Sequence, residues 1–146
     1  MYRPPNTQVE QFSNHIKDIT NQARSTSGKL MPELVIGMDH NIDLLKGMHH
    51  APTHGFIELM SELNLLPMIT RPSRITHHSA TLIDNIYVSE QLHRSFESII
   101  IIDNMSDHLP LVTMLKQTKV LNKEPIIFLS CCLNEDKLKK VSHLLM

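Results

Sequence analysis

Three short polar clusters in this sequence carry side chains that can act on a phosphate group. Asp39 and Asn41 follow an apolar run, where a carboxylate can take a proton from water while an amide hydrogen-bonds a phosphate oxygen. Asp107 and His108 are adjacent, so the carboxylate can bind a divalent cation while the imidazole hydrogen-bonds the reacting phosphate. Asp84 lies inside another apolar run, where burial of its charge is costly unless another group pairs with it.

Each cluster also has an interpretation that involves no chemistry. Asp39 and Asn41 are common turn residues and could close a strand with an Asx turn. Asp84 could point to solvent from the polar face of its strand, and residues 106–110 could form a polar turn before the next strand. The order of the three clusters along the chain is therefore more informative than any one of them.

The apolar patterns around these clusters predict a layered domain. Helical spacing covers residues 7–24, where Thr7 and Glu10 offer a capping box, and residues 56–66, which Pro67 ends. Apolar runs predict strands at residues 34–36, 68–70, 82–88, 98–102 and 109–115, with polar loops at 40–53 and 71–80. Strands interspersed with two helices indicate an α/β or α+β domain, in which each polar cluster stands at a strand end.

The composition is that of an ordinary soluble globular protein of one domain. The 146 residues carry a formal net charge of −1, so bulk electrostatic attraction to nucleic acid is not expected, although one local groove could still meet DNA. We find no secretory signal and no membrane span in the sequence, and the adjacent Cys131 and Cys132 favour a reducing, intracellular compartment. The ten histidines lack the spacing of a zinc site.

Taken in order, the motifs Asp-x-Asn, Ile-Asp-x-Ile and Ser-Asp-His-x-Pro resemble the C-terminal half of the signature of the endonuclease/exonuclease/phosphatase superfamily. Residues 69–76 (ITRPSRIT) and 79–86 (SATLIDNI) resemble the endonuclease region of non-LTR retrotransposon proteins that also carry a reverse transcriptase. Residues 2–5 (YRPP) look like the tyrosine-containing strand end before the first helix of these nucleases. The resemblance implies an α/β fold, namely the C-terminal half of a four-layer α/β sandwich with a mixed, mainly antiparallel sheet and flanking helices.

The resemblance also divides the chain into two parts. Residues 1–116 correspond to a partial endonuclease/exonuclease/phosphatase domain. Residues 117–146 are similar to the linker that leads toward the reverse transcriptase, which is itself absent from the sequence. Within this linker, the apolar pattern predicts a strand at 125–129 and a short helix at 134–145.

The family reaction that the resemblance implies is metal-assisted hydrolysis of a DNA phosphodiester. Tyr2 matches the tyrosine that contacts the phosphate, and Asp39 matches the acid that orients or activates the attacking water. Asn41 matches the amide that positions this water. Asp84 matches the carboxylate that hydrogen-bonds the catalytic histidine, and His108 matches that histidine, which holds the scissile phosphate oxygen. Cations and donors already in place stabilise the charge that builds on phosphate oxygens.

Four further residues complete the implied site. Asp107 matches a carboxylate at the Mg²⁺ site. Arg71, Arg74 and Thr81 fit contacts to DNA phosphates, although a solvated loop explains these three equally well. The resemblance therefore implies Mg²⁺ as the cofactor and the DNA phosphate backbone as the partner, with no membrane contact and with nuclear localisation if the protein is functional.

Two departures from the family pattern limit the expected activity. One extra residue separates Gly37 from Asp39, although the spacing between Asp39 and Asn41 is intact. The family's first half, which supplies an asparagine and a metal-binding glutamate, has no counterpart before Met1. We therefore expect weak Mg²⁺ binding and weak or absent activity. We also expect self-association through apolar sheet residues, such as 99–102, that the first half would cover.

Three other interpretations stay open. The chain could be a non-catalytic DNA- or protein-binding remnant of the same fold. It could be a phosphatase-like member of the superfamily that acts on a small phosphate ester, which residues 71–86 argue against. It could also be an unrelated small α/β domain with accidental motifs.

Overall fold

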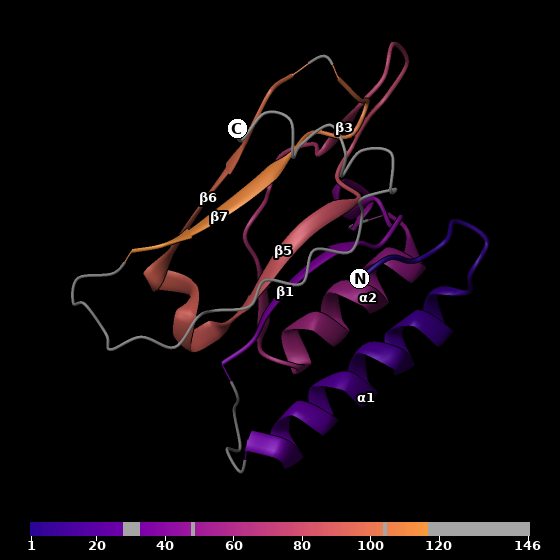
Figure 1. Cartoon of the computed structure of the whole chain (residues 1–146). Helices are drawn as coiled ribbons and strands as arrows, with labels where there is room; N and C mark the ends of the chain where they lie inside the picture. The colour runs from indigo at the N-terminus through magenta and orange to yellow at the C-terminus, as the bar shows by residue number, and fades with distance from the viewer. Residues whose placement is uncertain (28–32, 48, 104, 117–146) are drawn as a thin grey trace, which may run out of the picture.

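Two α-helices and three small antiparallel sheets make up the part of the chain that the structure describes (Figure 1). This computed structural model describes residues 1–27, 33–47, 49–103 and 105–116. Its elements are, in chain order, α1 (Val9–Ser27), β1 (Val35–Asp39), η1 (Leu44–Lys46), α2 (Ala51–Glu62), β2 (Leu65–Pro67), β3 (Arg74–Ile75), β4 (Ala80–Thr81), β5 (Asp84–Ser89), η2 (Glu90–Ser95), β6 (Phe96–Ile100) and β7 (Leu111–Leu115). Among these described elements, no helix combines the length and the apolar character that a membrane crossing needs.

The central sheet places two acids, Asp39 and Asp84, opposite each other. Its strand order is β1-β5-β2, and both pairings are antiparallel. Val35 pairs with Val88 at one end and Asp39 pairs with Asp84 at the other, so the last residue of β1 meets the first residue of β5. Because side chains alternate between the two faces, a slip of one residue would separate the acids and turn the core residues of one strand outward.

The N-terminal segment lies beside β1 on the side that does not face β5. Tyr2 forms a parallel bridge with Asp39. The Asp39 amide donates to the Met1 carbonyl at 3.0 Å, and the Arg3 amide donates to the Asp39 carbonyl at 2.9 Å. The N-terminal segment therefore bonds both the amide and the carbonyl of Asp39 on one side, and β5 pairs with Asp39 on the other side.

The two helices lie along one face of the central sheet and enclose the core with it (Figure 1). The core consists of apolar and aromatic side chains from both helices and the sheet, namely Phe12, Ile16, Met38, Ile42, Phe56, Met60, Leu65 and Tyr87. Phe12 and Phe56 stack with ring centroids 6.2 Å apart, and Phe56 meets Tyr87 edge to face at 6.4 Å. Burying a side chain of this size stabilises the fold by about 1.5–3 kcal/mol.

Strands β6 and β7 form a separate ribbon that leaves apolar side chains in solvent. Ile99 pairs with Val112, and Met114 lies on the same face two residues further along β7. Ile99 is 48% exposed, Met114 is 49% exposed, and Ile102 beyond the end of β6 is 85% exposed. The sequence predicted exposed apolar residues at 99–102; residues 99, 101 and 102 are exposed, and Ile100 is partly buried.

The second helix lies earlier in the chain than the apolar spacing predicted. It spans Ala51–Glu62 rather than residues 56–66, so the predicted loop at 40–53 is shorter than expected. Pro52 is in its first turn, where the amide that proline lacks has no helical partner in any case. Pro52, which the sequence placed in a loop, therefore lies at the start of a helix.

The strand predicted at residues 68–70 is wrong, because the chain pairs with β5 earlier, at Leu65–Pro67. The cause is Asn64, which adopts φ 54 in the left-handed region and so ends the helical path. Leu65 can then enter the core instead of continuing the helix, and it is 1% exposed. Met68 still donates its amide to the Ile86 carbonyl at 2.8 Å, just past the end of the strand.

The first helix begins at Val9, so Thr7 is not its N-cap and the predicted capping box is wrong. The Thr7 amide instead donates to the Pro4 carbonyl at 3.0 Å, and the Thr7 carbonyl accepts from the Arg3 guanidinium. A local turn between residues 3 and 7 therefore takes the place of the expected cap. The helix also continues to Ser27, beyond the predicted end at residue 24.

The remaining strands lie close to their predicted positions. The runs at 82–88, 98–102 and 109–115 are observed as β5, β6 and β7, each displaced by two residues or fewer at its ends. The loop predicted at 71–80 contains β3 and the first residue of β4, which pair as a short hairpin. The strand predicted at 125–129 and the helix predicted at 134–145 lie outside the described residues.

Phe56→Ala should lower the free energy of unfolding by about 3–5 kcal/mol, because it deletes a fully buried ring at the centre of the aromatic cluster. Urea titration followed by circular dichroism measures this change. Ile57→Ala, at a neighbouring side chain that is 41% exposed, is the control and should cost far less. Equal losses at the two positions would show that the aromatic cluster is not the centre of the core.

Candidate active site at the end of the central sheet

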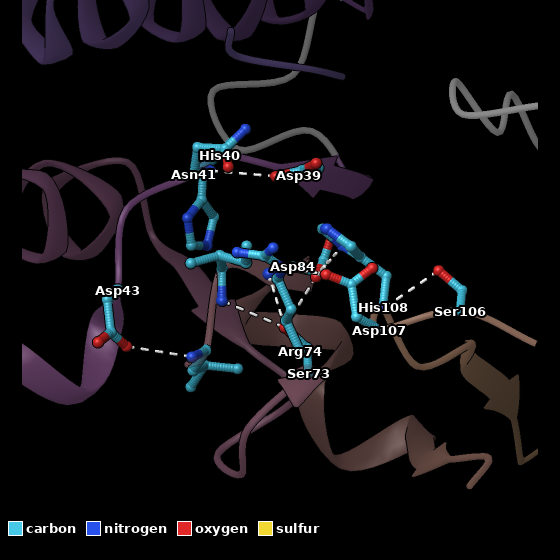
Figure 2. A network of polar contacts seen from close by, with 12 residues as sticks. Asp39, His40, Asn41, Asp43, Ser73, Arg74, Asp84, Ser106, Asp107 and His108 are labelled. Atoms are coloured by element: carbon cyan, nitrogen blue, oxygen red, sulfur yellow. Dashed lines mark hydrogen bonds and ion pairs between the residues drawn. The ribbon is translucent and has the colours of Figure 1, made fainter. Parts of the chain in front are cut away.

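Three titratable side chains from distant parts of the sequence meet at one end of the β1–β5 pair. The ligand atoms of Asp39, Asp84 and His108 all lie within 4.8 Å of one another, and all three residues are partly buried. Asp39 ends β1, Asp84 begins β5, and His108 comes from the loop before β7. Figure 2 shows the Asp84 and His108 side chains pointing toward each other, with Asp39 on the neighbouring strand. The structure therefore brings residues of all three polar clusters together.

Asp84 and His108 form a hydrogen-bonded pair. His108 Nδ1 lies 3.0 Å from Asp84 Oδ2, and the two side chains are 38% and 16% exposed. With a carboxylate as the acceptor, the ring proton is on Nδ1, and Nε2 is the nitrogen that can engage a ligand. The pairing also offsets the cost of placing an acid at the end of an apolar strand.

Main-chain bonds fix the loop that carries His108. His108 forms an antiparallel bridge with Arg74. The Leu109 amide donates to the Ser73 carbonyl at 2.7 Å, and the His108 amide donates to Ser106 Oγ at 3.2 Å. The loop before β7 is therefore docked on β3 and positioned relative to β5.

Ser73 links these segments from a fully buried position. Its side-chain hydroxyl donates to Asp84 Oδ2 at 2.9 Å. The Ser73 hydroxyl oxygen also accepts from the amides of Ile83 at 3.1 Å and Asp84 at 2.8 Å. The sequence interpretation missed Ser73, because a serine after a proline in a polar stretch gives no sign of burial.

The Asp39–Asn41 segment forms the Asx turn that was the alternative without chemistry. The Asn41 amide donates to Asp39 Oδ1 at 3.1 Å, and Asn41 adopts φ 47. Asparagine is one of the few residues that tolerate this left-handed conformation. The Asn41 side chain donates through Nδ2 to the Arg3 carbonyl at 2.8 Å, which ties the turn to the N-terminal segment.

Arg3 is a second residue that the sequence interpretation missed. Its side chain is 5% exposed, and its guanidinium donates to the carbonyls of His40 at 2.5 Å and Asn41 at 2.8 Å. It also donates to the Thr7 carbonyl. Burial lowers the pKa of Arg3, and the nearby Asp39 carboxylate opposes this shift. A buried arginine thus clamps the Asp39–Asn41 turn to the start of the chain, although the YRPP stretch indicated only its tyrosine.

His40 is a core residue, although it lies between Asp39 and Asn41. Its side chain is fully buried and its ring packs against Phe56, with centroids 5.2 Å apart. Burial lowers the pKa of His40 to about 3, and the Arg3 charge acts in the same direction. The neutral ring accepts the Ile42 amide at Nδ1, so this histidine turns away from the site.

The carboxyl group of Asp39 has a raised pKa. Burial raises the pKa of Asp39 above its ordinary value, and the Asp84 carboxylate on the paired strand raises it further. The Asn41 amide, His108 and Arg3 oppose these effects. The two facing carboxylates repel each other when both are ionised. A cation bound between them would therefore be stabilised.

Asp107 lies next to this cluster and pairs with Arg74. Arg74 Nε donates to Asp107 Oδ2 at 2.7 Å, and the side chains are 38% and 45% exposed. This hydrogen bond lowers the pKa of Asp107. Two residues that the sequence assigned to metal and to DNA thus contact each other, and Asp107 is not among the three converging ligands.

The other predicted site residues lie outside the three-residue cluster. The Tyr2 side chain is 52% exposed, while its backbone pairs with Asp39. Arg71 is exposed, and Thr81 is partly buried in β4, where it pairs with Arg74. Among the described residues, no hydrogen bond or ion pair joins these three side chains to the Asp39–Asp84–His108 cluster.

The donor set of the cluster fits a hard divalent cation. Asp39 and Asp84 offer carboxylate oxygens, which Mg²⁺ prefers, and Mg²⁺ keeps several waters when only one or two carboxylates bind it. The proton-bearing Nδ1 of His108 already bonds Asp84, so the ring is better placed to contact a phosphate than a metal. The mutual repulsion of Asp39 and Asp84 would be relieved by such a cation.

Comparison with known families agrees with this arrangement. Residues 1–112 match the endonuclease-reverse transcriptase family, so the chain belongs to that family. No curated protein matches the chain by sequence.

A solved structure shares the fold. The endonuclease domain of TRAS1, a telomere-specific non-LTR retrotransposon, superposes with a TM-score of 0.64 at 19% sequence identity. The match covers 81% of this chain and 56% of that domain, so the chain spans little more than half of the length of its structural relative. The fold is therefore the α/β fold of a retrotransposon endonuclease domain, as the sequence resemblance implied.

Asp39→Asn should stabilise the metal-free fold at neutral pH. The folded pKa of Asp39 is raised above 3.8, so the folded state resists ionisation and loses stability as the pH rises from 3.8 through the folded pKa. The amide has no such penalty and still offers an oxygen to the Asn41 amide. Urea unfolding in EDTA should show a larger gain at pH 7 than at pH 3.5.

Asp107→Asn provides a control of opposite sign for this measurement. The Arg74 hydrogen bond lowers the pKa of Asp107, so its ionised form favours folding and the substitution should reduce stability slightly at pH 7. Stabilisation by both substitutions would point to a general charge effect, and destabilisation by Asp39→Asn would contradict the raised pKa.

Proposed function

We propose that this chain carries part of the active site of a Mg²⁺-dependent endonuclease that nicks DNA for retrotransposition. The observation that carries the proposal is the convergence of Asp39, Asp84 and His108 at one end of the central sheet. Membership of the endonuclease-reverse transcriptase family supports DNA as the substrate. Nicking of chromosomal DNA would place the functional protein in the nucleus.

Each side chain of the cluster has a separate role in the proposed hydrolysis. Asp39 takes the proton of the attacking water, and its raised pKa makes its carboxylate a stronger base. Water oxygen then bonds to phosphorus while the bond to the leaving DNA oxygen breaks. The protonated ring of His108 donates from Nε2 to the scissile phosphate oxygen, and Asp84 fixes the orientation of this ring.

The surrounding residues position the substrate and the turn. Tyr2, Arg71, Arg74 and Thr81 are proposed to contact DNA phosphates. Tyr2 and Arg71 are exposed, and Arg74 and Thr81 are partly exposed. Asn41 holds the Asp39 turn and is placed to orient the water.

We propose that this chain alone binds Mg²⁺ weakly and turns over slowly. Mg²⁺, when bound, supplies positive charge that stabilises the phosphate oxygens. Asp39 and Asp84 are the oxygen ligands already in place, and Asp107 can join them only by leaving Arg74. The unmatched remainder of a TRAS1-like domain, supplied in trans, should therefore raise the rate.

Purified protein should nick supercoiled plasmid slowly with Mg²⁺ and not in EDTA, and His108→Ala should reduce the rate by roughly 10²-fold or more. His54→Ala is the matched control, because it removes an exposed histidine on α2 far in sequence from the cluster. Gel separation of nicked and supercoiled plasmid gives the rates. Equal rates for His108→Ala and the unaltered chain would reject the assignment. A folded chain that binds plasmid without nicking it would favour the non-catalytic DNA-binding remnant.

We also propose that two copies of the chain associate through the exposed face of β6 and β7. This face presents large apolar side chains to solvent, which soluble monomers seldom do over a continuous patch. Ile99 and Met114 lie on it, and two more exposed isoleucines, Ile101 and Ile102, follow β6 directly in the chain.

The double variant Ile99→Thr/Met114→Thr should shift the chain toward monomer by at least several-fold in the dissociation constant from analytical ultracentrifugation. Threonine keeps the preference for strands while removing apolar area. Ile75→Thr, at an exposed isoleucine on the β3–β4 hairpin, is the control and should change little. A monomeric unaltered chain at high concentration would exclude this interface.

A further inference from the structure

Ser73 is the one described residue that contacts both the Asp84 side chain and the backbone next to His108. Its hydroxyl bonds Asp84, its carbonyl accepts from Leu109 at 2.7 Å, and its amide donates to the Thr81 carbonyl at 3.0 Å. We propose that Ser73 is a positioning residue that sets the orientation and tautomer of the Asp84–His108 pair. Its consequence for catalysis rests on the proposed endonuclease function, whereas its effect on the pair does not.

The hydroxyl of Ser73 can donate in one direction only. A serine hydroxyl has one proton to donate and two lone pairs that accept. The amides of Ile83 and Asp84 occupy the accepting side, at 3.1 and 2.8 Å. The single proton is therefore left for Asp84 Oδ2 at 2.9 Å. Two backbone amides thus hold the hydroxyl in place and direct its proton at the carboxylate.

This donor removes a freedom that Asp84 would otherwise have. The terminal torsion of an aspartate is broad, so one bond from a half-exposed imidazole does not fix the carboxylate plane. Asp84 Oδ2 accepts from both Ser73 Oγ and His108 Nδ1, at 2.9 and 3.0 Å (Figure 2). Two donors on one oxygen, one of them fixed to the backbone, define where the imidazole must lie.

Burial makes the contact hard to replace. Ser73 is 0% exposed, so water cannot readily take over the hydroxyl's bonds when the side chain is shortened. The Leu109 amide, which bonds the Ser73 carbonyl, follows His108 directly in the chain. Ser73 therefore bonds both the Asp84 carboxylate and the main chain beside His108.

The test reads the tautomer of His108 directly. Long-range ¹H–¹⁵N spectra of the folded chain, at a pH where imidazoles are neutral, distinguish the Nδ1–H from the Nε2–H form. We expect the unaltered chain to show Nδ1–H at His108 and Ser73→Ala to move both ring nitrogens toward the average of the two forms. Ser106→Ala removes a hydroxyl that bonds the His108 amide but not Asp84, and its spectrum should keep the Nδ1–H pattern.

Ser73→Cys covers the case in which Ser73→Ala does not fold. Cysteine is nearly the same shape and donates only weakly, so the tautomer should again shift toward the average. A folded Ser73→Ala, or failing that a folded Ser73→Cys, with the unaltered His108 pattern would overturn the proposal and leave Ser73 as a structural turn residue.

The nicking assay separates this inference from the proposed function. If the unaltered chain nicks plasmid, Ser73→Ala should lower kcat on the order of 10-fold with KM for DNA unchanged, as expected when a residue behind a site is removed. If the unaltered chain does not nick at all, the tautomer spectra still decide the role of Ser73, and only the endonuclease proposal fails.

Discussion

The antiparallel register of β1 against β5 is the constraint on which the rest of the structure depends. It fixes Asp39 opposite Asp84 at one end while Met38 and Tyr87 face the helices. Because strand side chains alternate, the burial of the core residues and the meeting of the two acids are set by one register. The hydrophobic core therefore constrains the site geometry, since a one-residue slip that separated the acids would also expose apolar side chains.

Around this strand pair, hydrogen bonds from buried polar side chains hold the loops in place, because these loops have no regular secondary structure. Arg3 donates to backbone carbonyls of the Asp39–Asn41 turn, and Ser73 donates to Asp84. Both residues are nearly or fully buried, so their bonds are not exchanged with water. Such contacts contribute modestly when made and cost more when one partner is lost, because a buried donor or acceptor is then unsatisfied. Loss of either side chain would therefore leave buried hydrogen-bonding partners unsatisfied.

The same arrangement has costs for stability. Asp39 lies where burial and a second carboxylate raise its pKa, which is unfavourable for the folded chain and favourable for a base. The β6–β7 ribbon leaves isoleucine and methionine side chains in solvent, although its strands carry the loop that supplies His108. The chain spans 56% of the length of the TRAS1 endonuclease domain.

The sequence by itself determined the α/β class, the approximate positions of four of the strands and the three polar clusters at strand ends, because apolar periodicity and turn residues are local signals. It also determined the family, because its motifs occur in a characteristic order. Only the tertiary structure decided that Arg3 and Ser73 support the site and that Asp107 pairs with Arg74. These contacts join residues between 11 and 38 positions apart, and no local pattern of residue types encodes such hydrogen bonds. Their geometry follows from the strand register and the burial of the core, which exist only in the folded chain.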